Sequence, residues 1–101
     1  MIQNFRDKDL AVFWLSQGQK SVKCVPSELR KATYQKLLML DQARSLGDLA
    51  IFPSNNLEKL KSKSHLDCWS IRINIRYRLI FIWKNSQVWE VEINKHNKRS
   101  Y

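Results

Sequence analysis

The fold is decided by residues 68–93, which read CWSIRINIRYRLIFIWKNSQVWEVEI. Apolar and polar side chains alternate over residues 68–73, and this period of two predicts a β-strand with one buried face. Residues 77–83 are apolar on both faces except at Arg78, which is typical of a central strand covered on both sides. Residues 84–87 are polar and predict a hairpin turn, after which residues 88–93 alternate again. The stretch therefore predicts an antiparallel meander with residues 77–83 at its centre.

The same alternation assigns side chains to the faces of the sheet. Ser70 and Arg72 share one face of the strand at 68–73. In the strand at 88–93, Trp89 is expected on the same face as Val91 and opposite Val88. We expect three tryptophans to be core residues: Trp69, Trp83 and Trp89.

The N-terminal half shows helical periodicity. A first helix begins at Asp7 or Asp9, carries an apolar stripe with the i, i+3, i+4 spacing, and ends at Gly18. A second helix begins at Pro26 and continues without a helix breaker to about Arg44.

Three shorter elements complete the prediction. Residues 2–5 are compatible with an edge strand, residues 46–49 with a turn or a one-turn helix, and residues 56–61 with a strand. Because the helices come before the run of strands, the order favours an α+β fold. The length of 101 residues favours a single domain spanning 1–101.

The charge is unusual for a chain of this size. Eighteen Lys and Arg residues against nine Asp and Glu residues leave a net charge of +9. Residues 1–50 hold eight bases and five acids, whereas residues 51–101 hold ten bases and four acids. This excess favours a polyanionic partner, either nucleic acid or an acidic protein, over a charge that serves only solubility. We expect the functional surface in the second half.

Targeting and redox signals favour a cytoplasmic protein without a membrane partner. Residues 1–9 contain no apolar signal-peptide core, and no apolar run is long enough to span a bilayer. The two cysteines, Cys24 and Cys68, are too few for a disulfide scaffold, and their spacing predicts no zinc site. The sequence also contains no phosphate-binding glycine loop and no nucleophile motif.

Arg78 is the most informative candidate for a functional residue because it interrupts the most apolar strand. A guanidinium there is at least partly desolvated and needs a carboxylate, a set of carbonyls or a bound phosphate. One hypothesis is a structural ion pair with Glu58, Glu90 or Glu92. The other is a clamp for a phosphate group or a transition state.

The turn before residue 77 decides the cross-strand neighbour of Arg78. A two-residue turn at residues 74–75 places Arg78 opposite Ile71, whereas a three-residue turn places it opposite Arg72. Two opposed arginines repel each other, so the second arrangement favours an anion site. The sequence is compatible with both.

Other candidates lie near Arg78 or at the C-terminus. His96 follows the last strand, and a histidine can donate or accept a proton near neutral pH, although a terminal histidine is also often only solvated. Tyr77 lies beside two arginines and is a candidate for stacking on a base. The basic tail, which includes Lys95, is a candidate for phosphate contacts.

Several motifs occur in order along the chain: MIxxFxDK at 1–8, KLLMLDQA at 36–43, SLxDL at 45–49, PSNNLEKLK at 53–61, WSIRINxxYRLIFxW at 69–83 and VEI at 91–93. In these motifs the chain resembles the HigB group of the RelE/ParE toxin superfamily. The resemblance implies two N-terminal helices packed on a small twisted, mainly antiparallel β-sheet. It also implies a toxin of a type II toxin–antitoxin system that cleaves mRNA on the ribosome as an endoribonuclease and thereby inhibits translation, without a metal or other cofactor. The implied partners are the ribosome, mRNA and a HigA-like helix-turn-helix antitoxin, which forms a hetero-oligomer with the toxin.

The resemblance further implies roles for individual residues. Lys61, Arg78 and His96 are implied as catalytic, with Lys61 or a nearby base removing a proton, Arg78 stabilising charge and His96 protonating the leaving oxygen. The residues expected to bind RNA are Arg72, Arg76, Tyr77, Lys63 and Lys95. The chain departs from the group at residues 94–96, where Asp-Tyr-His is common, and at residues 62–67, which lack glycine.

Two other classes of function stay open. The ParE branch of the superfamily acts on DNA gyrase by binding, without catalysis. A decayed toxin would bind only its antitoxin, and the altered C-terminus is compatible with this. Lys61 and His96 favour the enzyme, because a pure binding protein needs neither.

Overall fold

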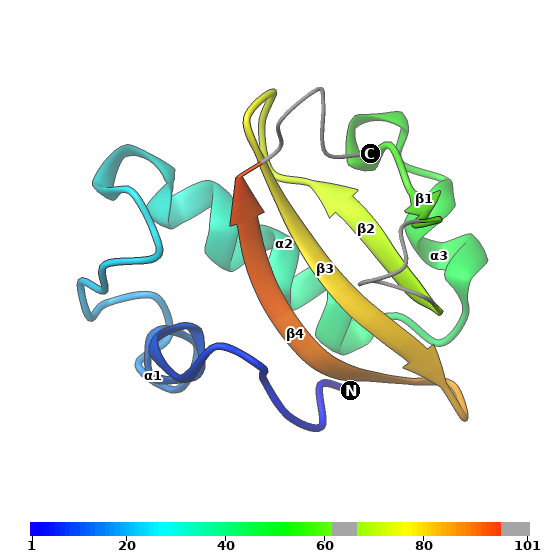
Figure 1. Cartoon of the computed structure of the whole chain (residues 1–101), viewed down its shortest axis with the longest axis horizontal. Helices are drawn as coiled ribbons and strands as arrows, with labels where there is room; N and C mark the ends of the chain where they lie inside the picture. The colour runs from blue at the N-terminus through cyan, green and yellow to red at the C-terminus, as the bar shows by residue number, and fades with distance from the viewer. Residues whose placement is uncertain (62–66, 96–101) are drawn as a thin grey trace.

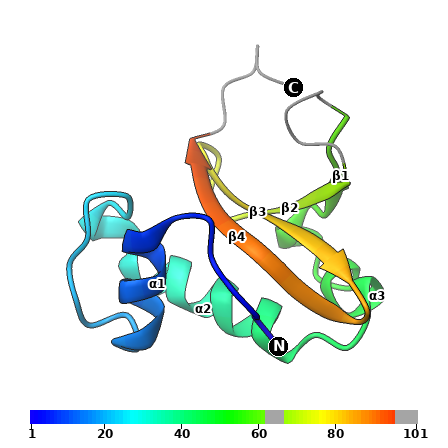
Figure 2. The ribbon, with the colours of Figure 1, turned by 60° about the horizontal axis from the view of Figure 1, so that its bottom comes forward.

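The computed structural model describes residues 1–61 and 67–95, which form helices on one face of an antiparallel sheet (Figure 1). The four strands found in these residues are neighbours in chain order: β1 (Glu58–Lys59), β2 (Cys68–Arg72), β3 (Tyr77–Lys84) and β4 (Gln87–Lys95). All three pairings are antiparallel, so the predicted meander with a central strand at 77–83 is confirmed. Figure 2 shows α1, α2 and α3 on the same side of the sheet.

The first helix, α1 (Lys8–Leu15), begins where the capping residue was predicted. Asp7 is the N-cap, and its carboxylate accepts the backbone N–H groups of Asp9 and Leu10 at 3.1 and 3.4 Å. The helix ends at Leu15 with Ser16 as its C-cap, and the chain leaves it through Gly18, which has a positive φ of 78°.

The second helix, α2 (Arg30–Gln42), starts later than predicted because residues 27–29 form a separate 3₁₀ turn. Its buried face carries Leu37 and Leu40, which belong to the main hydrophobic core. The predicted one-turn helix is α3 (Leu46–Ala50), which begins with a capping box between Ser45 and Asp48.

The edges of the sheet are shorter than the sequence suggests. The segment before α1 does not form a full strand, but makes isolated parallel bridges from Ile2 to Val88 and from Phe5 to Val91. The strand expected over residues 56–61 is only two residues long. Short edges of this kind limit pairing with other chains.

The two hairpin turns set the register of the sheet. Asn85 and Ser86 both have positive φ values, 55° and 60°, as a two-residue type I′ hairpin requires. In the β2–β3 hairpin, the backbone N–H of Ile73 donates to the carbonyl of Tyr77 at 2.9 Å, which leaves a three-residue tip. Arg72 is therefore the cross-strand partner of Arg78, one of the two arrangements that the sequence allowed.

The prediction that Trp89 is a core residue is wrong. Glu90 has a φ of 50°, and the β3–β4 register shifts between Ile80 and Ile82, so β4 contains a β-bulge. The extra residue changes the face of every side chain before it, because the pleat alternates with a period of two. Val88 and Val91 therefore both join the core, whereas Trp89 pairs with Ile82 on the opposite face.

The main core lies between the helices and one face of the sheet. It includes Phe13 of α1, Leu37 of α2, and Ile71 and Phe81 of the sheet. Trp69 and Trp83 pack against this core while remaining partly exposed. A smaller cluster of Leu60, Cys68 and Ile80 lies on the other face. None of the helices in the described ranges is long and apolar enough to cross a membrane.

Candidate functional site

The face of the sheet opposite the helices carries Arg78. Because side chains alternate along the strands, Ser70, Arg72 and Arg78 share this face, as the sequence predicted for the first two. We call these three residues, together with Glu58 of β1, the Arg78 cluster.

Arg78 is buried, with 4% of its surface exposed. Its Nη1 donates to Oγ of Ser70 at 3.0 Å and lies 3.5 Å from Oε2 of Glu58. The Glu58 side chain is 46% exposed, and its Oε1 accepts a hydrogen bond from Nδ2 of Asn56 at 3.0 Å. The guanidinium is therefore compensated inside the fold, by one of the three carboxylates that the sequence proposed.

The roles of Ser70, which belongs to the Arg78 cluster, and of Asn56, which contacts its Glu58, were not predicted from the sequence. Ser70 is fully buried and provides the oxygen that fixes Nη1 of Arg78. Asn56 has a left-handed backbone with a φ of 44°, which ends the 3₁₀ turn at residues 53–55 and turns its amide toward Glu58. The alternation of β2 places Ser70 on the Arg72 face and was the one sequence signal for Ser70. No sequence pattern indicated Asn56.

The arginines beyond Arg78 are accessible. Arg72, the cross-strand partner of Arg78, and Arg76, in the turn, are both exposed. Lys95 is also exposed and lies opposite Tyr77 at the same end of the sheet. Arg72 and Arg76 therefore lie where β2 ends and β3 begins, whereas Lys95 shares the face of Tyr77 at the end of β4.

Tyr77 lies on the other face of the sheet from the guanidinium of Arg78. It is half-buried and packs against the main core. A base stacked on its exposed edge would therefore approach from the helix side rather than from the Arg78 cluster.

Lys61 is not brought close to Arg78. It follows Leu60, whose backbone N–H donates to the carbonyl of Cys68 at 2.9 Å, so Lys61 lies level with Asp67. Three residues separate that level from Ser70, which holds the guanidinium of Arg78, and this corresponds to about 10 Å along the strand. The residue of this segment that reaches Arg78 is Glu58. Lys63 and His96 lie outside the described residues.

Cys68, on the same face, is a thiol in its protonated form. Burial raises the pKa of Cys68 above its ordinary value. A protonated thiol is a poor nucleophile, so Cys68 acts here as a small apolar side chain.

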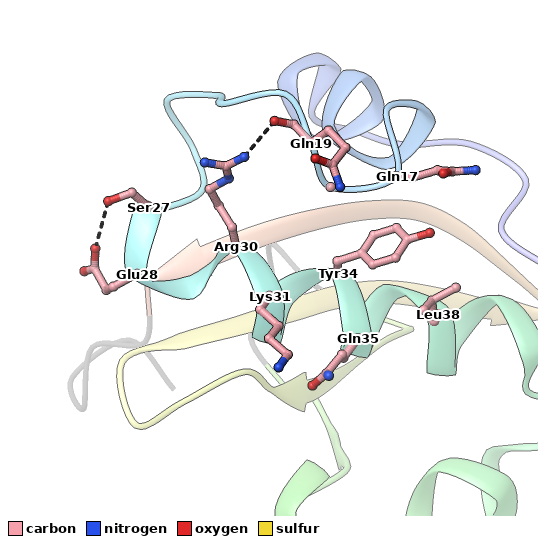
Figure 3. Close-up of a pocket in the computed structure, with 10 residues that line it drawn as sticks. Gln17, Gln19, Ser27, Glu28, Arg30, Lys31, Tyr34, Gln35 and Leu38 are labelled. Carbon is pink, nitrogen blue, oxygen red and sulfur yellow. Dashed lines mark hydrogen bonds between the residues drawn. The ribbon is translucent and has the colours of Figure 1, made fainter.

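A separate cavity of about 580 Å³ lies on the helix side, between α2 and the chain before it (Figure 3). Arg30 points across it and donates to the carbonyl of Gln19 at 2.7 Å, while Lys31 and Tyr34 project from α2. Of the residues predicted to be catalytic, the two that the structure describes, Lys61 and Arg78, do not line this cavity, so the candidate site remains the Arg78 cluster with its exposed arginines.

Comparison with known protein families identifies the family to which this chain belongs. The family model for the RelE-like toxin HigB of type II toxin–antitoxin systems matches residues 3–96. The chain belongs to the HigB-like toxin family. Within this family it is 36% identical to toxin HigB-1 of Vibrio cholerae serotype O1, over 95% of this chain and 98% of that protein. It is also 35% identical to an uncharacterised protein of Haemophilus influenzae, over 94% of this chain and 91% of the other.

The fold of this HigB-like toxin also matches a solved structure. The YoeB–YefM complex from Staphylococcus aureus contains a chain that superposes with a TM-score of 0.57 over 96% of this chain and 97% of the other, at 18% identity. The likeness confirms the RelE-like α+β fold that was expected from the resemblance. The chain is thus a RelE-like toxin of a type II toxin–antitoxin system.

Proposed function

We propose that this toxin is a ribosome-dependent endoribonuclease that cleaves mRNA and so inhibits translation. The observation that carries the proposal is the Arg78 cluster, a fixed guanidinium beside exposed Arg72 in a chain of the HigB-like family. An RNA phosphate that passes through a pentacoordinate state gains negative charge, and guanidinium groups stabilise such charge best when they are already in place.

The proposed reaction uses the 2′-hydroxyl of the RNA as the nucleophile. A base removes the proton from this hydroxyl, its oxygen forms a bond to phosphorus, and the bond from phosphorus to the 5′-oxygen breaks. A general acid gives a proton to the leaving 5′-oxygen. The products are a 2′,3′-cyclic phosphate and a 5′-hydroxyl end.

The residues divide these tasks as follows. Arg78 and Arg72 stabilise the phosphate, His96 is the proposed general acid, and Lys61 is the base implied by the resemblance. Glu58 is a second candidate for the base, because its half-exposed carboxylate lies beside the Arg78 guanidinium whereas Lys61 lies about 10 Å farther along the strand. Arg76, Tyr77, Lys63 and Lys95 are proposed to bind the RNA.

Two variants distinguish the candidates for the base. If Glu58 is the base, Glu58→Gln abolishes cleavage of ribosome-bound mRNA and Lys61→Met retains it. If Lys61 is the base, the results are reversed. Cleavage is measured with purified ribosomes programmed with a short mRNA, and retention of cleavage by both variants rejects both assignments.

The proposed partners are the ribosome and a HigA-like antitoxin. Family membership in a type II toxin–antitoxin system supports an antitoxin partner, and the net charge of +9 supports a polyanionic target. Co-expression with a cognate HigA-like antitoxin should restore growth and yield a complex of both chains on size-exclusion chromatography.

A non-enzymatic toxin is the second candidate, and one observation favours it. Arg78 is 4% exposed and already paired with Glu58, so its charge is satisfied without a ligand. In that case growth arrest would proceed with intact mRNA and would not depend on the charge of Arg78.

A further inference from the structure

The tip of the β2–β3 hairpin, residues Asn74–Arg76, presents an apolar side chain to solvent. Ile75 is 76% exposed. Exposure alone is no sign of function, since single apolar residues are common on protein surfaces and Ile51, after α3, is 70% exposed. What distinguishes Ile75 is the structure and charge around it.

The hairpin tip is held rigidly by its own hydrogen bonds. The side-chain oxygen of Asn74 accepts the backbone N–H groups of Arg76 and Tyr77 at 2.9 and 2.8 Å. The Ile73–Tyr77 backbone hydrogen bond closes the turn below them. A rigid tip loses little conformational entropy when it binds, which favours affinity.

The charged side chains in the segment of sequence that forms the hairpin are all positive. Residues 68–89 contain Arg72, Arg76, Arg78 and Lys84 and no acid. Arg76 is next to Ile75 and exposed, and Arg72 and Lys95 are exposed at the same end of the sheet. An apolar side chain among cations fits a polyanion that also has flat apolar surfaces, which describes nucleic acid better than a protein partner.

We infer that the hairpin tip is a docking contact for structured RNA, in which Ile75 packs against a base or ribose while Arg76 binds a phosphate. The inference rests on the proposed function, under which this RNA is ribosomal RNA. Because Ile75 and Arg76 are exposed whereas Arg78 is buried, the contact sets the affinity for the ribosome and leaves the chemical step to the Arg78 cluster.

The test compares two aspartate substitutions at isoleucines of similar exposure, Ile75 and Ile51. Ile75→Asp should weaken binding to purified 70S ribosomes at least about tenfold, because it removes an apolar contact and places a carboxylate near phosphates. Ile51→Asp is the matched control and should bind as the wild type does. Binding is measured by co-sedimentation, and thermal denaturation of both variants verifies that they are folded.

A milder pair of variants separates the two kinds of contact. Ile75→Ala should weaken binding without changing its dependence on salt. Arg76→Gln should weaken binding and also make the salt dependence less steep, because one phosphate contact is lost.

The outcomes distinguish this inference from the proposed function. Equal ribosome binding by Ile75→Asp, Ile51→Asp and the wild type overturns the role of the tip, even if the wild type cleaves mRNA. Loss of binding only in Ile75→Asp supports the role of the tip, even if no cleavage is found and the nuclease proposal fails. If Ile75→Asp binds ribosomes normally but escapes rescue by a co-expressed antitoxin, the tip contacts a protein and the inference is wrong.

Discussion

Arg78 combines a full charge with an almost completely buried side chain. Ser70 and Glu58 compensate its guanidinium through a 3.0 Å hydrogen bond and a 3.5 Å ion pair. Burial of a charge is unfavourable unless such partners exist, and an apolar side chain of similar volume often gives equal or higher stability. The fold alone therefore does not require an arginine at this position, and this is the residue-scale reason to connect Arg78 with function.

Arg78→Met tests this argument. Because methionine fills a similar volume without charge, we expect the free energy of unfolding to fall by no more than about 2 kcal/mol, mainly from the unpaired Ser70 hydroxyl. The variant should no longer arrest growth. Urea denaturation measures the first quantity and induced expression the second. A folded Arg78→Met protein that remains toxic would assign Arg78 a structural role only.

Cys24 provides a prediction of pH dependence. Burial, together with the nearby carboxylate of Asp7, raises the pKa of Cys24 to about 12. In the unfolded chain the thiol titrates near its ordinary value of 9.0, so the folded state binds the proton more tightly. Its stabilising contribution is complete below pH 9 and is lost as the pH rises toward about 12.

The wild type should therefore lose stability between pH 9 and 12 more steeply than Cys24→Ala. Thermal denaturation at each pH measures the difference between the two proteins, which cancels the titration of lysines and tyrosines. Parallel pH profiles of the two proteins would show that the thiol is not held protonated by the fold.

At the scale of elements, the sequence predicted the helices and strands that depend on the local pattern of apolar residues. The strands at 68–73 and 77–83 and the helix that includes Leu37 follow directly from the period of their apolar residues. The bulge in β4 was not predictable, because Glu90 adopts a positive φ without being glycine and thereby moves Trp89 out of the core. Periodicity cannot indicate an extra residue that changes the phase within a strand.

The site was predicted less completely, because it depends on register. The identity of Arg78 followed from a charge in an apolar strand, but its partner Ser70 required the length of the β2–β3 turn. The separation of Lys61 from Arg78 also follows from the β1–β2 register, which two strand residues set and no local pattern indicates.

The β3–β4 turn gives a prediction at the element scale. Ser86 has a φ of 60°, a conformation that glycine adopts without strain. Ser86→Gly should raise the free energy of unfolding by about 0.5–1 kcal/mol, because Asn-Gly is the preferred pair for a type I′ turn. Ser86→Ala, measured in the same urea titration, should give no gain. A loss of stability in Ser86→Gly would contradict the turn geometry.

At the scale of the whole molecule, the helices cover one face of the sheet (Figure 2), and the alternation along the strands puts the Arg78 cluster on the opposite face. The helices bury one face, and the other face, with the adjoining hairpin tip, holds the exposed cations at the end of β2. Part of the net charge of +9 therefore lies at the predicted functional surface.

This distribution predicts strong salt dependence of RNA binding. Binding to 70S ribosomes should weaken steadily as salt rises from 50 to about 200 mM, with a linear relation between the logarithms of affinity and salt concentration. The double variant Arg72→Gln/Arg76→Gln should reduce the slope by about two phosphate contacts. Co-sedimentation at four salt concentrations gives the slope, and an unchanged slope in the double variant would place the phosphate contacts elsewhere.

The most direct test of the central claim is a map of new RNA ends in cells. After brief induction, 5′-hydroxyl ends are sequenced across the transcriptome for the wild type and for Arg78→Met. We predict new ends within translated reading frames in the wild type and none in Arg78→Met. Growth arrest by the wild type without new ends, or identical ends in both strains, would contradict cleavage of mRNA through Arg78.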